Sequence, residues 1–222
     1  MRAIITIYLL CAFLAPAYAI NGGKPSLLDQ IPKDLRPKIQ EYSQSLREQN
    51  RQIEEQQRQI QQKLNNAKSL QELENIIKEN NLITSLFVSI DLSKFSDEIT
   101  DDTLKMLAEL VPNISNLSLR GAYNNLTDKG RDYLARLTGL AELDLSNANI
   151  KDNQLNYIAR LENLEKLILE NTDITGVGLR KLSNLNKLKE LYLQTTEVPV
   201  EAIREFKKDK PKIKIFKGWI EY

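Results

Sequence analysis

The sequence predicts an α/β fold, in which a short solenoid of parallel strands and short helices follows one long helix. Two observations carry this prediction. A leucine pattern returns at steps of 24 to 26 residues through the second half of the chain. Before it, residues 35–66 lack glycine and are dense in glutamine, glutamate and arginine, a composition that favours a helix.

The first nineteen residues, MRAIITIYLLCAFLAPAYA, have the layout of a secretory signal peptide. One positive charge precedes an apolar run, and Ala17-Tyr18-Ala19 provides a small-x-small cleavage site. We therefore expect cleavage after Ala19 and a secreted or periplasmic protein. The alternative is an uncleaved membrane anchor over residues 3–20, since about 20 apolar residues span a bilayer. A membrane is an expected partner only in that alternative.

The chain has no histidine, and its one cysteine, Cys11, lies within the predicted signal peptide. A mature chain without either residue type has no disulfide, thiol nucleophile, serine–histidine pair or cysteine/histidine zinc site. We therefore predict no catalytic, cofactor-binding or metal-binding residues, and no enzymatic activity. Lysine and arginine (31) balance aspartate and glutamate (30), whereas a nucleic-acid partner would favour a basic excess.

The region before the repeats divides into a lead-in and a helix. Residues 20–34 contain two glycines and two prolines and predict a flexible lead-in. The long helix over 35–66 carries half of a coiled-coil seam, because one apolar position recurs every seven residues while the partner position is mostly polar. Two interpretations stay open: a solvated helix, or a weak homo-oligomer formed through 35–66. The apolar positions are Ile39, Leu46, Ile53 and Ile60.

A second helix is predicted within residues 67–85. Ser69 and Glu72 have the spacing of a capping box, in which each side chain satisfies a backbone N–H at the start of a helix. We expect this helix to cap the repeat domain, residues 86–222. Aromatic and aliphatic residues near the C-terminus are expected to close the other end: Phe216, Trp219, Ile220 and Tyr222.

The repeat domain predicts six short strands. In LAELDL (140–145), Leu143 and Leu145 alternate with Asp144, which places both leucines on one side of a strand. One such coil cannot bury its own apolar side, so neighbouring coils must stack. The central aliphatic residues predicted to align are Ile90, Leu117, Leu143, Leu167, Leu191 and Ile213.

These segments resemble the leucine-rich repeat family and its pattern L-x-x-L-x-L-x-x-N/T-x-I, over about residues 86–216. The usual asparagine position holds Ala148, Thr172 and Thr196, as in a T-x-I-T/D variant of about 24 residues found in bacterial secreted proteins. The resemblance implies strands on a concave face, helices on a convex face, and protein–protein interaction as the usual role.

Function is expected between the inner leucines, on the concave face. Three rows of side chains are predicted there, and most are ordinary polar residues. Lys214 follows Tyr192 in the second row, and Ser146 lies in the third. The exceptions are Ile168, Tyr192 and Phe216, since clustered exposed apolar residues often mark a contact site. Phe216 could instead belong to the C-terminal cap. The candidate partner-binding residues are Ile168, Tyr192, Glu170, Gln194, Asp144, Arg120, Lys166 and Glu190.

Two charged stretches have structural interpretations. Asp101-Asp102 predict a helix cap. The lysine-rich stretch over 204–217 predicts a solvated terminal face, and the alternative is contact with an anionic membrane surface or nucleic acid. The leading hypothesis is a non-enzymatic module that binds an unidentified protein through its concave face. The alternatives are a membrane-anchored tether of the cell envelope, and a secreted effector or adaptor acting on a host protein, for example in substrate recognition by a ubiquitin ligase.

Overall fold

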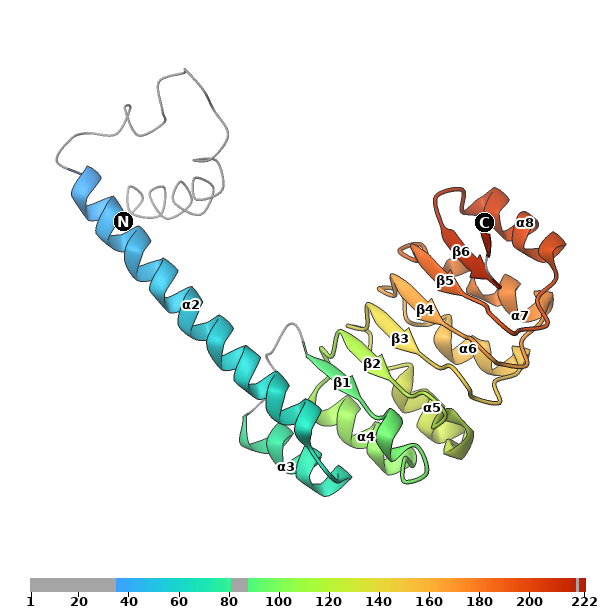
Figure 1. Cartoon of the computed structure of the whole chain (residues 1–222), viewed down its shortest axis with the longest axis horizontal. Coiled ribbons are helices and arrows are strands. Elements are labelled where there is room, and N and C mark those ends of the chain that lie inside the picture. Colours follow the sequence, from blue (N-terminus) through green and yellow to red (C-terminus); the bar gives the residue numbers. More distant parts are fainter. Residues whose placement is uncertain (1–34, 81–87, 219) are drawn as a thin grey trace, which may run out of the picture. The chain divides into compact units, whose positions relative to one another are not determined.

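The computed structural model describes residues 35–80, 88–218 and 220–222 (Figure 1). The predicted signal peptide, its predicted cleavage site, the predicted lead-in and Trp219 lie outside the described residues. The chain forms two compact units, residues 1–59 and 60–222, and helix α2 (Arg36–Asn66) contributes to both. Within the described part of the chain, no helix is both long and apolar enough to cross a bilayer.

The second unit contains one seven-stranded sheet whose strands follow chain order. The first six strands are parallel, and the seventh pairs antiparallel with the sixth. The strands are β1 Ser89–Asp91, β2 Asn116–Ser118, β3 Glu142–Asp144, β4 Lys166–Ile168, β5 Glu190–Tyr192, β6 Lys214–Lys217 and β7 Ile220–Glu221.

Helices connect successive parallel strands and lie on one side of the sheet (Figure 1). This is an α/β arrangement of stacked parallel strands and helices, as the sequence predicted. The α-helices are α3 Leu70–Glu79, α4 Asp101–Leu110, α5 Asp128–Leu134, α6 Leu155–Ile158, α7 Gly176–Lys181 and α8 Val200–Asp209. The 3-10 helices are η4 Ser93–Phe95, η5 Tyr123–Asn125, η6 Asp152–Gln154 and η7 Leu182–Asn184.

The aliphatic residues at the strand centres form the spine of the core. Leu117, Leu143, Leu167 and Leu191 are paired in register, and each is at most 2% exposed. Burying each of these side chains stabilises the fold by about 1.5–3 kcal/mol before entropy is subtracted. The stacking of coils on a shared aliphatic spine is therefore confirmed.

The predicted alignment of the last strand is wrong by two residues. Leu191 pairs with Ile215, not with Ile213. Both isoleucines are buried, because side chains two apart in an extended segment point to the same side. The sequence pattern could not distinguish them, and the hydrogen-bond register selects Ile215, which keeps the 24-residue step.

The N-terminal end of the solenoid is covered by α3 and by the last turns of α2. Leu73 and Ile77 of α3 are buried, and so are Leu64 and Ala67. The Ser69 hydroxyl accepts a hydrogen bond from the backbone N–H of Glu72 at 3.1 Å, as predicted. The Glu72 carboxylate, however, accepts from the backbone N–H of Lys68 at 2.8 Å instead of that of Ser69.

The C-terminal end is closed only partly as predicted. Strand β7 pairs with β6, and the backbone N–H of Tyr222 donates to the Ile215 carbonyl at 2.8 Å. Tyr222 packs against the core, as predicted, whereas Ile220 is 57% exposed. Helix α8 adds the buried side chains of Ile203 and Phe206 to this end.

Aspartates at the helix side of the repeats link one coil to the next. The Asp152 carboxylate accepts from the backbone N–H of Thr175 at 2.8 Å and from its hydroxyl at 2.7 Å. Asp101 accepts in the same way from Thr127 of the following coil. Asp101 was predicted to cap its own helix, but the N-cap of α4 is Thr100. The Asp101 side chain therefore joins repeats instead of capping a helix.

Candidate functional site

We call the side of the sheet that faces away from the helices the open sheet face. The sequence predicted that this face is concave. Two rows of outward side chains cross it in the observed register. The first row is Ser89, Asn116, Glu142, Lys166, Glu190 and Lys214. The second row is Asp91, Ser118, Asp144, Ile168, Tyr192 and Phe216.

The polar residues in the middle of this face already bind one another. The Asn116 amide donates to Glu142 at 3.3 Å, and the Glu142 carboxylate pairs with the Lys166 ammonium at 2.7 Å. The hydrogen bond to Glu142 raises the pKa of Lys166, against an opposing contribution from burial. This part of the face therefore carries little unsatisfied charge.

The apolar side chains gather at the C-terminal end of the same face. Ile168, Tyr192 and Phe216 lie on adjacent strands at paired positions, and we call these three residues the apolar patch. The Tyr192 and Phe216 rings are stacked, with centroids 4.6 Å apart and planes at 18°. The corrected register places Phe216 beside Tyr192, where the sequence alignment had put Lys214.

Polar neighbours hold the Tyr192 ring in place. Its hydroxyl donates to the Glu190 carboxylate at 3.1 Å, and the Lys166 ammonium lies 5.6 Å from the ring centroid. Burial and the hydrogen bond to Glu190 raise the pKa of Tyr192, so the phenol stays neutral and remains a donor. The patch is half-buried and edged by charges: Ile168, Tyr192 and Phe216 all have intermediate exposure.

Asp144 has a structural role within its own strand end. Its carboxylate accepts from the backbone N–H of Ser146 at 2.8 Å and from the Ser146 hydroxyl. Asp91 accepts from the backbone N–H of Ser93 in the same way. Burial opposes the charge on Asp91, but the hydrogen bonds from Ser93 outweigh it and lower its pKa. Ser146 was predicted to lie on the open surface, but it is 2% exposed because its hydroxyl turns back to Asp144.

The remaining candidates lie beyond the two rows. Arg120 is exposed, and its guanidinium lies beside the Asn147 side-chain amide. Glu170 and Gln194 are half-buried. The Gln194 side-chain oxygen is buried without a hydrogen-bond partner among the described residues. The structure brings Lys166, Glu190 and the apolar patch together, and it places Asp144 beside Ile168 on the adjacent strand. Arg120 lies beyond the two rows.

Each of the strands β2 to β5 is followed, three residues after its end, by a residue with a left-handed backbone conformation. We did not predict this feature from the sequence. Gly121, Asn147, Asn171 and Thr195 have φ between 54° and 75°, a region that glycine and asparagine tolerate and β-branched residues do not. They recur at steps of 26, 24 and 24 residues. That recurrence was the available signal, and Thr195, next to the patch, is the strained member of the series.

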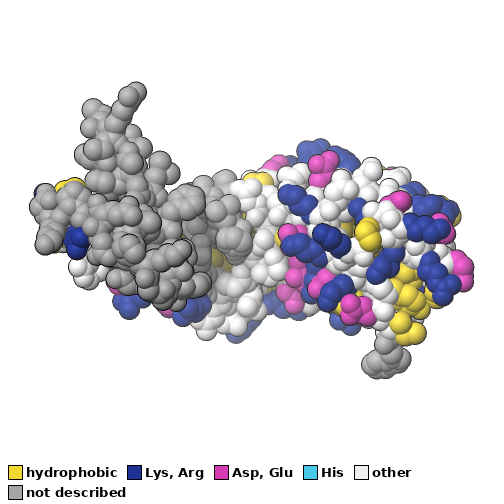
Figure 2. All heavy atoms as spheres, turned by 90° about the horizontal axis from the view of Figure 1, so that it is seen from above, with side chains coloured by type: hydrophobic (Ala, Val, Ile, Leu, Met, Phe, Trp, Pro, Cys, Tyr) yellow, Lys and Arg dark blue, Asp and Glu magenta, His cyan; other side chains and the backbone are white. Residues whose placement is uncertain are grey.

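Several lysines of the C-terminal stretch hydrogen-bond to the backbone of the fold. The ammonium groups of Lys207, Lys210 and Lys217 donate to the backbone carbonyls of Ile213, Leu185 and Thr196. Burial lowers the pKa of Lys210 and Lys217. In Figure 2, basic and acidic side chains are interspersed over the visible side of the solenoid, and hydrophobic ones gather near the C-terminal strands.

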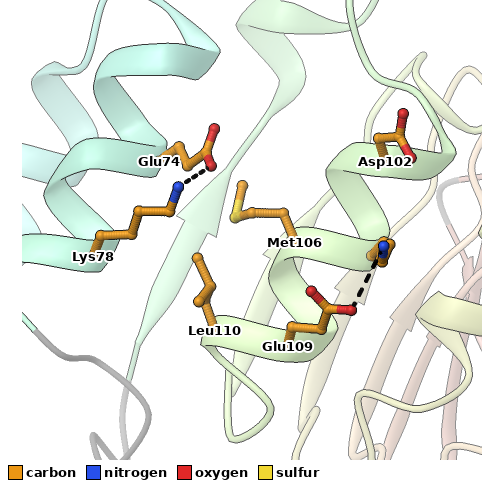
Figure 3. Close-up of a pocket in the computed structure, with 7 residues that line it drawn as sticks. Glu74, Lys78, Asp102, Met106, Glu109 and Leu110 are labelled. Atoms are coloured by element: carbon orange, nitrogen blue, oxygen red, sulfur yellow. Dashed lines mark hydrogen bonds and ion pairs between the residues drawn. The ribbon is translucent and has the colours of Figure 1, made fainter.

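A shallow groove lies between α3 and α4 (Figure 3). It has a volume of about 320 Å³. Four of its charged residues form pairs along each helix, Lys78 with Glu74 at 2.5 Å and Lys105 with Glu109 at 3.9 Å. Among the described residues no group of three or more acidic, histidine or cysteine side chains is placed to hold a metal ion. The groove is lined by Glu74, Lys78, Asp102, Lys105, Met106, Glu109 and Leu110.

No family model matches the chain, and no curated protein sequence matches it. Among solved structures it is similar to internalin C2 from Listeria monocytogenes, with 18% identity and a TM-score of 0.41 over 67% of this chain and 74% of that one. It is similar to the Chaetomium Mex67:Mtr2 subunits, with 17% identity and a TM-score of 0.40 over 69% and 92%.

The yeast Rad7 and Elc1 complex is also similar, with 19% identity and a TM-score of 0.43 over 78% of this chain and 46% of that chain. Likeness at this level assigns neither a family nor a partner. The repeat architecture rests instead on the strand register and the buried spine.

Proposed function

We propose that the protein is a non-enzymatic interaction module that binds a protein partner through the open sheet face, centred on Tyr192. One observation carries the proposal. The polar residues of the face are paired with each other, whereas Ile168, Tyr192 and Phe216 form an apolar patch in register on adjacent strands.

The patch has the chemistry of a binding hot spot. Tyrosine is over-represented at such sites, and a ring of polar contacts around an apolar centre excludes water. Lys166 and Glu190 provide this surround, and their contacts with Tyr192 fix its ring before a partner arrives. Binding therefore costs little side-chain entropy. The partner we expect presents an aliphatic or aromatic side chain to the patch and polar groups to Arg120, Glu170 and Gln194.

Affinity capture with three matched variants tests this function. Tyr192→Ala and Ile168→Ala should each lose the protein that the wild-type chain retains. Val177→Ala is the control, because Val177 is 52% exposed on helix α7 and lies outside the open sheet face. A partner retained equally by all three variants would show that the apolar patch is not the binding site.

We further propose that residues 1–19 are a signal peptide and that the mature protein, of the bacterial secreted type, begins at Ile20 outside the cytoplasm. The support is the charged start, apolar run and Ala17-Tyr18-Ala19 site. Sequencing the N-terminus of the exported protein is the test. A chain that keeps residues 3–20 would favour the membrane-anchored alternative.

A further inference from the structure

Helix α2 presents a continuous exposed surface within the first compact unit. It is 31 residues long. Every residue from Arg47 to Gln59 is exposed, and Ile53 is 50% exposed. Contact with the core of the second unit begins at Ile60, which packs against that core. Leu64, one turn later, is buried in it. Most helical stability in proteins comes from the packing of one face. Among the described residues the stretch from Arg47 to Gln59 is exposed on all sides, whereas Ile39, Tyr42 and Leu46 are half-buried.

The charges of this segment occupy only one side of the helix. With Ile39 as position a of a seven-residue repeat, Leu46 and Ile53 are also at position a. Between residues 39 and 59, every charged residue falls at positions b, c or f: Glu41, Arg47, Glu48, Arg51, Glu54, Glu55 and Arg58. Positions d, e and g hold only uncharged residues: Tyr42, Ser43, Ser45, Gln49, Asn50, Gln52, Gln56, Gln57 and Gln59.

The charged side is satisfied within the helix itself. Arg51 pairs with Glu48 at 3.1 Å, and Arg58 pairs with Glu55 at 3.2 Å. These pairs link positions c and f, which are remote from position a. The face formed by positions a, d, e and g, which we call the seam, is therefore free of net charge and carries an aliphatic stripe edged by amides and hydroxyls.

We propose that this seam pairs with the same seam of a second copy of the chain, as a parallel in-register two-stranded coiled coil over residues 39–59. A charged partner helix is normally selected by complementary charges at positions e and g, and this seam has none to offer. A second copy fits because amide side chains both donate and accept hydrogen bonds and so complement themselves.

The pattern also selects the orientation. In a parallel in-register pair, position a faces a and position d faces d, so aliphatic layers alternate with Gln49 and Gln56 layers. In an antiparallel pair, each isoleucine or leucine would face a d residue, and glutamine amides would be buried against aliphatic carbon. The polar d layers weaken the dimer, so the association should depend on concentration.

Sedimentation equilibrium of the full chain over a range of concentrations is the test. We expect the mass to rise toward twice that of the monomer. Gln49→Glu/Gln56→Glu should weaken the association by at least about tenfold, because it places like charges against each other across the seam. Gln40→Glu/Gln44→Glu makes the same chemical change at positions b and f and should leave it unaltered. A wild-type chain that stays monomeric, or equal effects of the two double variants, would overturn the proposal.

Disulfide trapping tests the orientation. In a Cys11→Ser chain, Gln56→Cys should form a covalent dimer readily, since position 56 faces itself in the parallel arrangement. Gln44→Cys, on the outer side, should not. Equal trapping of both, or none from Gln56→Cys, would contradict the parallel pairing. The proposal does not rest on the sheet-face function, because partner capture by the apolar patch is measured separately and a monomeric chain would leave it intact.

Discussion

The helix side and the sheet side of the same repeats use polar residues in opposite ways. At the helix side, the Asp152 carboxylate reaches across to Thr175, and a Cβ at Gly178 would lie 2.2 Å from its Oδ1. At the sheet side, Tyr192 is half-buried, and its hydroxyl donates to the half-buried Glu190 carboxylate. The repeat thus restricts residue choice where coils are joined and leaves it open on the face that we propose binds a partner.

Among the variants that test this contrast, Gly178→Ala should change the free energy of unfolding the most. Alanine favours a helix over glycine by about 1 kcal/mol, but its Cβ would displace the Asp152 carboxylate and press on Leu155. We expect a net loss of about 1–3 kcal/mol, because the hydrogen bonds to Thr175 are broken. Urea unfolding measures it. If the variant proved as stable as the exposed control Val177→Ala, the close approach at Gly178 would be unimportant.

Asp152→Ala should cost nearly as much, about 1–3 kcal/mol, since the Thr175 backbone N–H and hydroxyl lose their acceptor. Asp173→Ala, at an exposed aspartate nearby, is the control. In the Asp152→Ala background, Gly178→Ala should cost clearly less than in the wild-type chain, because the contact with the carboxylate is gone and only the contact with Leu155 remains. Additive losses in this double-mutant cycle would contradict the link between the two residues.

Tyr192→Ala should destabilise the fold by only about 1 kcal/mol, mainly through the lost stacking with Phe216. Its effect on partner capture should be much larger than its effect on thermal unfolding. A cooperative collapse at much lower temperature would instead place Tyr192 in the core and remove the contrast between the two sides.

Thr195→Asn should stabilise the protein by about 0.5–1 kcal/mol. Thr195 has φ of 55°, and asparagine tolerates this left-handed conformation better than a β-branched residue. Asn171→Thr, the reverse change at the equivalent position of the preceding repeat, should destabilise by a similar amount. Thermal unfolding of both variants checks the pair, and shifts of the same sign would contradict the assignment.

The smallest expected effect is a pH dependence at the helix side. Hydrogen bonds from Arg160 and Arg136 lower the pKa of Asp132. Its contribution to stability is therefore present above the unfolded pKa of about 3.9 and is lost as pH falls through the lower folded value. Arg160→Ala should bring the Asp132 pKa closer to 3.9 in an NMR titration. An unchanged pKa in that variant would show that Arg160 does not stabilise the carboxylate.

The leucine spacing alone predicted the stacked coils, the buried spine and the rows of outward residues on β1 to β5. Residues of a strand alternate between its two sides, so only one choice of inward side buries both Leu143 and Leu167. The Ser69 cap was equally local, since it depends on a side chain three residues from its donor. Such features follow from the sequence because their partners lie at fixed short separations or exact repeats.

Tertiary structure decided the rest. Ile213 and Ile215 fit the same alternation, and only hydrogen bonding to β5 selected Ile215 and so placed Phe216 on Tyr192. The pairing of Asp152 with Thr175 and the turn of Ser146 into the fold likewise depend on how adjacent coils and backbone groups meet. The physical reason is that periodicity fixes which side a residue faces, whereas the neighbour it meets is fixed only when the strands pair.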